Sequence, residues 1–152
     1  MRQVAISACL LGERCRYDAT DNYNPSLLHV LSNFQLIPFC PEDDAFGSPR
    51  PTMDLIETTE GLSAISNETG ADLSLPVETY AGDFFDAHPD ISLFIGKDRS
   101  PSCGVCSARK YDKEKMLLSS SEAGLMAQEA LRRGIESIDA EKYLERVVCK
   151  KS

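Results

Sequence analysis

Short apolar runs alternate with amphipathic stretches along the chain. Three runs have the length and composition of buried strands, at residues 3–7, 35–39 and 91–96. A fourth run at 135–138 is shorter. Pro38 cannot donate a ladder hydrogen bond, so the second run reads as an edge strand or a strand end. The pattern predicts a sheet of four strands joined by helical segments.

Between the strands, apolar residues recur at helical spacing. Asn24 and Pro25 resemble an N-cap and first helical residue, and that helix reaches Asn33. A second helix covers 76–88 and stops before Pro89. Ser119 and Glu122 resemble a capping box for a third helix that ends at Gly134. A last helix opens at Asp139.

The segment between the second strand and the 76–88 helix has a different character. Residues 43–52 are rich in Pro, Gly and Ser and predict a loop, and residues 53–58 and 62–66 flank a turn and predict a small hairpin. Strands that alternate with helices favour a mostly parallel, doubly wound sheet. We therefore predict one α/β domain over residues 1–152, with Rossmann-like topology and an inserted hairpin.

Cysteines follow three of the predicted strands. Cys9 comes after the first strand, Cys40 directly after the second, and Cys103 in the loop after the third. In a doubly wound sheet, ligands bind at the carboxyl ends of the strands, near the point where strand order reverses. One fold therefore places these three thiols at one edge of the sheet. The polar, aperiodic stretch 13–24 is too long for a simple connector and predicts a functional loop beside them.

Composition and charge narrow the classes of function. The chain has 152 residues, of which 42% are hydrophobic, and a formal net charge of −8. That charge argues against an extended nucleic-acid surface, which needs clustered Lys and Arg. The N-terminus lacks the apolar region of a signal peptide, and no apolar run reaches membrane-spanning length. We expect a cytoplasmic protein without a membrane segment.

In a reducing cytosol, six cysteines point to metal or thiol chemistry before structural disulfides. Three thiolates on a four-iron cubane leave one iron without a protein ligand, and such an iron prefers sulfur. Two other interpretations remain open. Buried free cysteines often act as small apolar side chains, and Cys103 with Cys106 forms a C-x-x-C pair that suits a redox dithiol or half of a zinc site.

Several separated blocks resemble one known family. They are Ser7-Ala8-Cys9-Leu10-Leu11-Gly12, Cys15-Arg16-Tyr17-Asp18, Cys40-Pro41-Glu42, Pro49-Arg50-Pro51 and Lys97-x-Arg99-Ser100-Pro101-Ser102-Cys103-Gly104. In this order they are similar to the signature of the thiouracil desulfidase family, over about residues 3–138. Blocks in the right order are much more specific than any one of them.

The resemblance implies an enzyme that replaces the sulfur of a thiolated pyrimidine by oxygen without redox change. It implies a [4Fe-4S] cluster held by Cys9, Cys40 and Cys103, with one iron not ligated by protein. The catalytic carboxylate falls on Glu42 and the catalytic serine on Ser100, with Ser102 as the alternative register. The expected partner is a thiouracil or thiouridine derivative. Without the resemblance, Glu42 reads as a surface carboxylate and Ser100 as a turn hydroxyl.

Other residues near these blocks are candidates for substrate binding. Arg16, Arg50 and Lys97 suit a phosphate or carboxylate, and Asp18 suits the edge of a pyrimidine, although residues of these types are more often solvated or paired locally. Cys15 lies between Arg14 and Arg16, whose charge is expected to lower its thiol pKa. Cys106 is not part of the family pattern and is a candidate for closing the fourth iron. The alternative functions are a thiol redox enzyme using Cys103 and Cys106, and a non-catalytic module that binds a metal or cluster.

Overall fold

The computed structural model describes residues 2–151, and the side chains of residues 2–148. Its parallel sheet contains β1 (Gln3–Ser7), β2 (Gln35–Phe39), β5 (Ile91–Gly96) and β8 (Glu136–Asp139), in the order β2-β1-β5-β8. All three neighbouring pairs are parallel. The α/β class and the four predicted strands of this sheet are confirmed, the last one shifted by one residue.

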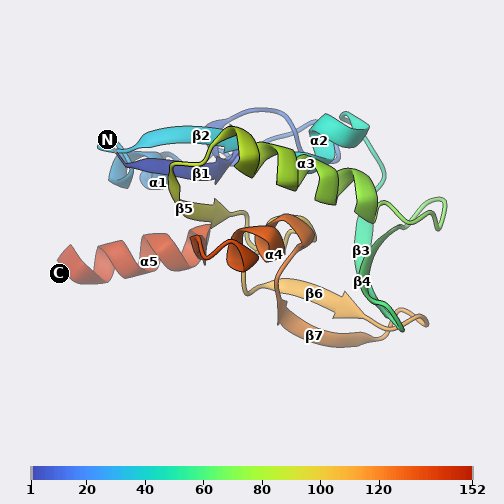
Figure 1. Cartoon of the computed structure of the whole chain (residues 1–152). Coiled ribbons are helices and arrows are strands. Elements are labelled where there is room, and N and C mark those ends of the chain that lie inside the picture. Colours follow the sequence, from blue (N-terminus) through green and yellow to red (C-terminus); the bar gives the residue numbers. More distant parts are fainter. Residues whose placement is uncertain (1, 152) are drawn as a thin grey trace.

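The strand order reverses at β1. The chain leaves β1 for β2 on one side and then returns past β1 to β5 on the other, so the switch point lies between β1 and β5. Their carboxyl ends point toward the part of the molecule where the second sheet lies, on the right of Figure 1. This is the position at which open α/β sheets bind ligands.

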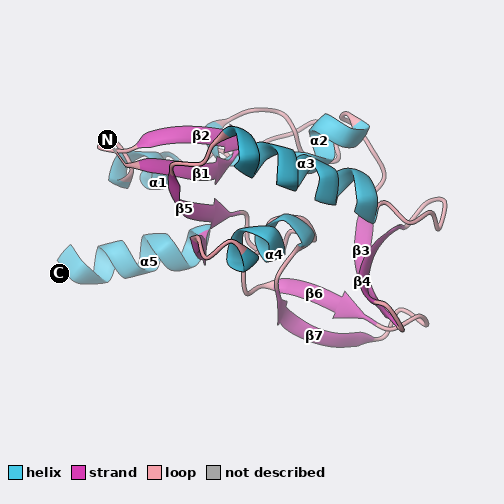
Figure 2. Ribbon diagram, viewed as in Figure 1, coloured by secondary structure: helices cyan, strands magenta, loops and turns pink. Residues whose placement is uncertain are grey.

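Helices cover both faces of the parallel sheet (Figure 2). One face packs against α1 (Pro25–Val30) and α5 (Ala140–Lys151), and the other against α3 (Ser74–Ala87) and α4 (Leu125–Arg132). Alternation along β1 explains the two layers, because Val4 and Ile6 are buried on the first face and Ala5 on the second. In that second layer Phe39 stacks on Phe94 with ring centroids 4.8 Å apart.

A second sheet extends the predicted hairpin. It has the order β4-β3-β6-β7, with β3 (Met53–Thr58), β4 (Gly61–Ser66), β6 (Ala108–Tyr111) and β7 (Leu117–Glu122). The β3–β4 and β6–β7 pairs are antiparallel, and β3–β6 is parallel. The hairpin is confirmed. The capping box is wrong, because Ser119 and Glu122 pair with β6 and α4 begins at Leu125 after Gly124.

A short helix replaces part of the predicted loop at 43–52. It is α2 (Pro41–Phe46), with Cys40 as its N-cap residue and Pro41 in its first turn. Glu42, Asp43 and Asp44 also occupy that turn, where negative charge is favourable near the helix N-terminus. Glu42 is therefore carried on a helix that starts at the end of β2. None of the helices within residues 2–151 combines the length and apolar character needed to cross a membrane.

Candidate functional site

A cavity of about 630 Å³ lies at the carboxyl edge of the parallel sheet. Its walls come from the loops after β1, β2 and β5, and from the start of β3 in the second sheet. The residues that line it are Ser7, Cys9, Cys15, Arg16, Tyr17, Asn22, Cys40, Pro41, Glu42, Arg50, Thr52, Met53, Asp54, Asn67 and the whole of 97–103. The structure therefore brings Cys9, Cys40 and Cys103 together with Glu42 and Ser100.

Three different local structures carry the three cysteines. Cys9 lies in the 3₁₀ turn η1 (Ala8–Leu11) that follows β1 directly, Cys40 precedes α2, and Cys103 lies in the loop after β5. Cys9 and Cys103 are buried and Cys40 is half-buried. All three are free thiols. Cys9 and Cys40 thus lie directly beside regular elements, whereas Cys103 lies within a loop.

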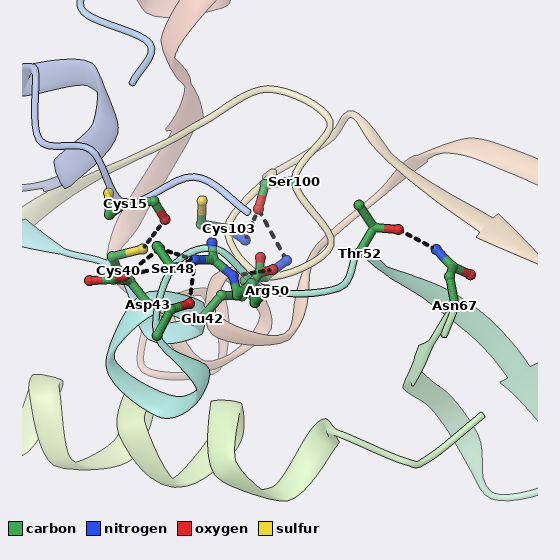
Figure 3. Close-up of polar contacts among 12 residues, drawn as sticks. Cys15, Cys40, Glu42, Asp43, Ser48, Arg50, Thr52, Asn67, Ser100 and Cys103 are labelled. Atoms are coloured by element: carbon green, nitrogen blue, oxygen red, sulfur yellow. Dashed lines mark hydrogen bonds and ion pairs between the residues drawn. The ribbon is translucent and has the colours of Figure 1, made fainter. Parts of the chain in front are cut away.

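Cys15 is a fourth cavity cysteine. It is 5% exposed, and the Cys40 thiol donates a hydrogen bond of 3.6 Å to its carbonyl oxygen, as Figure 3 shows. Its pKa is raised, first by hydrogen bonding to Cys40 and Cys9 and then by burial. The expected lowering by Arg14 and Arg16 is therefore wrong, because the neighbouring sulfurs outweigh those charges.

The pKa of the Cys9 thiol is shifted in the opposite direction. Its pKa is lowered to about 6, chiefly by the Cys15 thiol and also by Ser7, Asn22 and Lys97, while burial opposes the shift. The Ser7 hydroxyl lies 3.3 Å from Cys9 Sγ, and Asn22 Nδ2 donates to the same sulfur at 3.4 Å. Cys40 also has a lowered pKa, again chiefly because of Cys15. At neutral pH Cys9 is thus prepared as a thiolate, the form that binds metals.

Cys103 is held by close backbone packing. A Cβ atom on Gly96 would lie 1.7 Å from the Cys103 carbonyl oxygen, and one on Gly124 would lie 2.5 Å from the Ser102 carbonyl carbon. Only glycine allows the loop to pass between β5 and α4 at these distances. The first N–H groups of α4 complete the contact, since Met126 donates to the Ser102 carbonyl at 2.7 Å. Burial raises the Cys103 pKa to about 12.

Glu42 projects from α2 and has a partner at each oxygen. Ser102 Oγ donates to Glu42 Oε2 at 2.6 Å, and Arg50 Nε lies 3.6 Å from Glu42 Oε1. The Arg50 side chain is 6% exposed and also donates to Ser48 Oγ and the Gly47 carbonyl oxygen. Figure 3 shows this guanidinium between Glu42 and the Asp43–Ser48 turn. The carboxylate is fixed in orientation and compensated in charge.

Ser100 shapes the turn that leads to Cys103. Its Oγ accepts hydrogen bonds of 3.2 Å from the backbone N–H groups of Ser102 and Cys103. The oxygen is thereby used as an acceptor, and the hydroxyl proton is left for the Cys103 sulfur, where hydrogen bonding from Ser100 opposes the pKa increase caused by burial.

The remaining predicted residues divide into two groups. Arg16, Arg50, Lys97 and Ser102 line the cavity. Asp18 is absent from its lining, and its carboxylate instead accepts from the backbone N–H of Thr20 at 3.2 Å. Cys106 also lies outside the lining, where it is exposed and donates to the Ser121 carbonyl oxygen at 3.7 Å. The C-x-x-C pair is therefore split, because Cys103 faces the cavity and Cys106 does not.

Sequence reasoning missed one wall of the cavity. Thr52 and Asn67, which flank β3 and β4, line it and are joined by a 2.9 Å bond from Asn67 Nδ2 to Thr52 Oγ1. Tyr17, Asn22 and Asp54 were also not identified. Nothing in the local pattern marks Thr52, Asp54 and Asn67, since they reach the site only because the second sheet carries them to it. Tyr17 and Asn22 come from the 13–24 loop. The length of the 13–24 loop was the one available signal for Asn22.

The donor set favours a group larger than a single ion. Among the described side chains, no three His, Cys, Asp or Glu residues converge on one point suited to a metal ion. Four free cysteines, Cys9, Cys15, Cys40 and Cys103, instead line a cavity of about 630 Å³. Soft sulfur ligands along such a space fit an iron-sulfur cluster, whose ligands bind separate irons.

Comparisons with known proteins identify a family and a similar solved structure. The sequence profile of the 2-thiouracil desulfurase family matches residues 4–142. A solved structure described as the [4Fe-4S]-dependent thiouracil desulfidase TudS aligns with a TM-score of 0.72 and 24% identity, covering 99% of each chain. At this identity the likeness shows the fold. No protein of curated function matches the sequence significantly.

Proposed function

Because the chain belongs to the 2-thiouracil desulfurase family, we propose that it removes sulfur from thiolated pyrimidines by hydrolysis. One water supplies the oxygen of the product, the C=S carbon becomes C=O, and the sulfur leaves with the two water protons as hydrogen sulfide or its anion. No electron is transferred overall. The substrate is a thiouracil base or a thiouridine derivative.

The observation that carries the proposal is the meeting of three strand-end thiols with Glu42 in one cavity. We assign Cys9, Cys40 and Cys103 as ligands of a [4Fe-4S] cluster, leaving one iron without a protein ligand. The description of the similar TudS structure as [4Fe-4S]-dependent supports this assignment. When bound, such a cluster supplies a soft Lewis acid that prefers the substrate's sulfur and makes its carbon more electrophilic.

Glu42 is the general base in this proposal. A carboxylate held by Ser102 Oγ at 2.6 Å and faced by Arg50 has one fixed orientation, and can accept a proton from the attacking water. Ser100 orients that water or relays the proton, since its hydroxyl hydrogen is not used by the two N–H groups that its oxygen accepts. Ser102 supports Glu42 in the same step.

Cationic side chains at the cavity can bind the parts of the substrate other than its sulfur atom. Arg16 and Lys97 line it, and neither forms an ion pair within residues 2–148. Within the described part of the chain, Lys97 Nζ donates only to the Asp98 carbonyl oxygen, at 3.1 Å. These groups can therefore bind a pyrimidine oxygen or a phosphate without first breaking a salt bridge.

Anaerobic reconstitution with iron and sulfide tests the proposal. The protein should bind iron, consume thiouracil as its absorbance falls, and form uracil and sulfide in equal amounts. Failure of the iron-loaded protein to form uracil would contradict the function. A redox dithiol is not favoured, because Cys103 and Cys106 face different surroundings.

A further inference from the structure

Asp139 lies at the carboxyl edge of the sheet but outside the cavity. It is the last residue of β8, which pairs with β5, and it is 6% exposed. No Lys or Arg side chain forms an ion pair with it among the described residues. A buried carboxylate without a cationic partner needs several hydrogen bonds to compensate its charge.

Those hydrogen bonds all come from the loop that follows Cys103. Asp139 Oδ1 accepts from the Val105 N–H at 2.7 Å and from Ser107 Oγ at 2.9 Å. Asp139 Oδ2 accepts from the Cys106 N–H at 2.9 Å. Both carboxylate oxygens are thus occupied by the segment that begins two residues beyond Cys103.

The hydrogen-bond network of Asp139 also reaches the residues that precede Cys103. Ser107 Oγ, which donates to Asp139, accepts from the Arg99 N–H at 2.8 Å. Asp139 therefore ties together the start and the end of the loop. Two residues further on, the Glu141 N–H donates to Asp98 Oδ1 at 2.9 Å, so the junction of β8 and α5 contacts the loop's first residues as well.

We propose that Asp139 is a positioning residue that holds Cys103 and Ser100 in place by anchoring the N–H groups of the 99–107 loop. Carbonyl groups of this loop already accept hydrogen bonds from the first N–H groups of α4. Asp139 supplies the acceptors for N–H groups of the same loop. The effect of Asp139 on the position of Cys103 follows from these contacts alone. Its consequence for catalysis rests on the proposed function.

Asp139→Asn tests this role with little change of shape. Asparagine offers one oxygen and one NH₂ donor, so an N–H of Val105 or Cys106 loses its acceptor and faces another donor. In the full-length chain without iron, Cys103 is 4% exposed, and we expect its alkylation by iodoacetamide to become at least roughly tenfold faster. Cys9 and Cys15, measured in the same digest, should change by less than about twofold.

Reconstitution with iron and sulfide supplies the second readout. Asp139→Asn should lose its iron to a chelator faster than the unchanged protein, and the reduced cluster should give an altered paramagnetic resonance spectrum. Glu136→Gln at the other end of β8 is the matched control, since it removes an exposed ion pair with Arg2 and should behave as the unchanged protein. If Asp139→Asn does not fold, Ser107→Ala, which cuts one arm of the same network, should show the same selective alkylation of Cys103.

The possible results of these experiments distinguish a failure of the positioning role from a failure of the proposed function. Uniform acceleration at Cys9, Cys15 and Cys103, or no acceleration at Cys103, would overturn the positioning role. An unchanged protein that takes up no iron would contradict the proposed function and leave the alkylation result to decide the role of Asp139.

Discussion

Glu42 has a partner at each of its carboxylate oxygens. A hydroxyl holds one of its oxygens at 2.6 Å, and a guanidinium that is 6% exposed faces the other at 3.6 Å. Such a carboxylate loses little rotational freedom when a water approaches, because its orientation is already set by the fold. Catalytic groups gain efficiency from this kind of fixed geometry.

Replacing Glu42 by Gln should lower the rate of thiouracil desulfurisation by about 10²-fold or more, because the amide keeps the shape and removes the base. Iron content should stay unchanged, since Glu42 is not among the assigned ligands. The measurement is single-turnover loss of thiouracil by the iron-loaded protein. Asp44→Asn in the same helix turn is the control, as Asp44 does not line the cavity. A Glu42→Gln rate within about twofold of the unchanged protein would rule out the general-base role.

At the scale of residues, the sequence predicts which side chains line the site better than it predicts their pKa shifts. Cys9, Cys40, Glu42, Ser100 and Cys103 all line the cavity, because each belongs to a recognisable block at a strand end. The pKa of Cys15 was predicted in the wrong direction, since its neighbours in space are the sulfurs of Cys40 and Cys9 and not the adjacent arginines. Spatial neighbours of this kind leave no mark in the local sequence.

At the scale of elements, the loop after β5 depends on the glycine that precedes it. The backbone of Cys103 passes over Gly96 so closely that any side chain there would collide with it. Interior packing of this density does not relax easily, because the atoms in contact belong to the backbone on both sides.

Gly96→Ala should destabilise the protein by at least ~2 kcal/mol, as expected when extra volume is forced into a packed site. Gly82→Ala in α3 is the matched control. Nothing lies within 4 Å of a Cβ at Gly82, and alanine in a helix interior should stabilise by roughly 0.5–1 kcal/mol. Urea denaturation of both variants without iron measures the two changes. Equal stability of the two variants would show that the loop is not packed against β5 as described.

The hydrophobic pattern of each strand explains which elements could be predicted from the sequence. The two central strands of the parallel sheet, β1 and β5, are apolar and buried on both faces and are clear in the sequence. By contrast, β6 has four residues and β7 contains three consecutive serines, so neither shows a hydrophobic pattern. They form because β3 offers β6 a partner and β6 in turn pairs with β7. Pairing between distant segments decided these strands, and it overrode the apparent capping box.

At the scale of the whole molecule, two sheets create the site together. The parallel sheet delivers the thiols, and the start of β3 in the second sheet forms an opposite wall with Thr52, Met53 and Asp54. A concave site of this volume suits a small-molecule ligand. The net charge of −8 adds a further restriction, because it opposes binding to a polyanion.

The iron-loaded protein should therefore desulfurise free thiouracil or thiouridine but not thiouridine within intact transfer RNA. The net negative charge acts against the approach of the polymer. Product analysis after incubation with thiolated transfer RNA measures this, and the same RNA digested to nucleosides is the control. Desulfurisation of intact and digested RNA at similar rates would contradict the expected substrate class.

The assignment of three cysteine ligands is the central claim, and iron content across single Cys→Ser variants tests it most directly. Under anaerobic reconstitution the unchanged protein should hold about four irons per chain. Cys9→Ser, Cys40→Ser and Cys103→Ser should each lose the cluster. Cys15→Ser and Cys106→Ser should retain it, since one of these thiols stands beside the ligands and the other lies outside the cavity. Loss of the cluster in Cys15→Ser together with its retention in any of the three ligand variants would contradict the account.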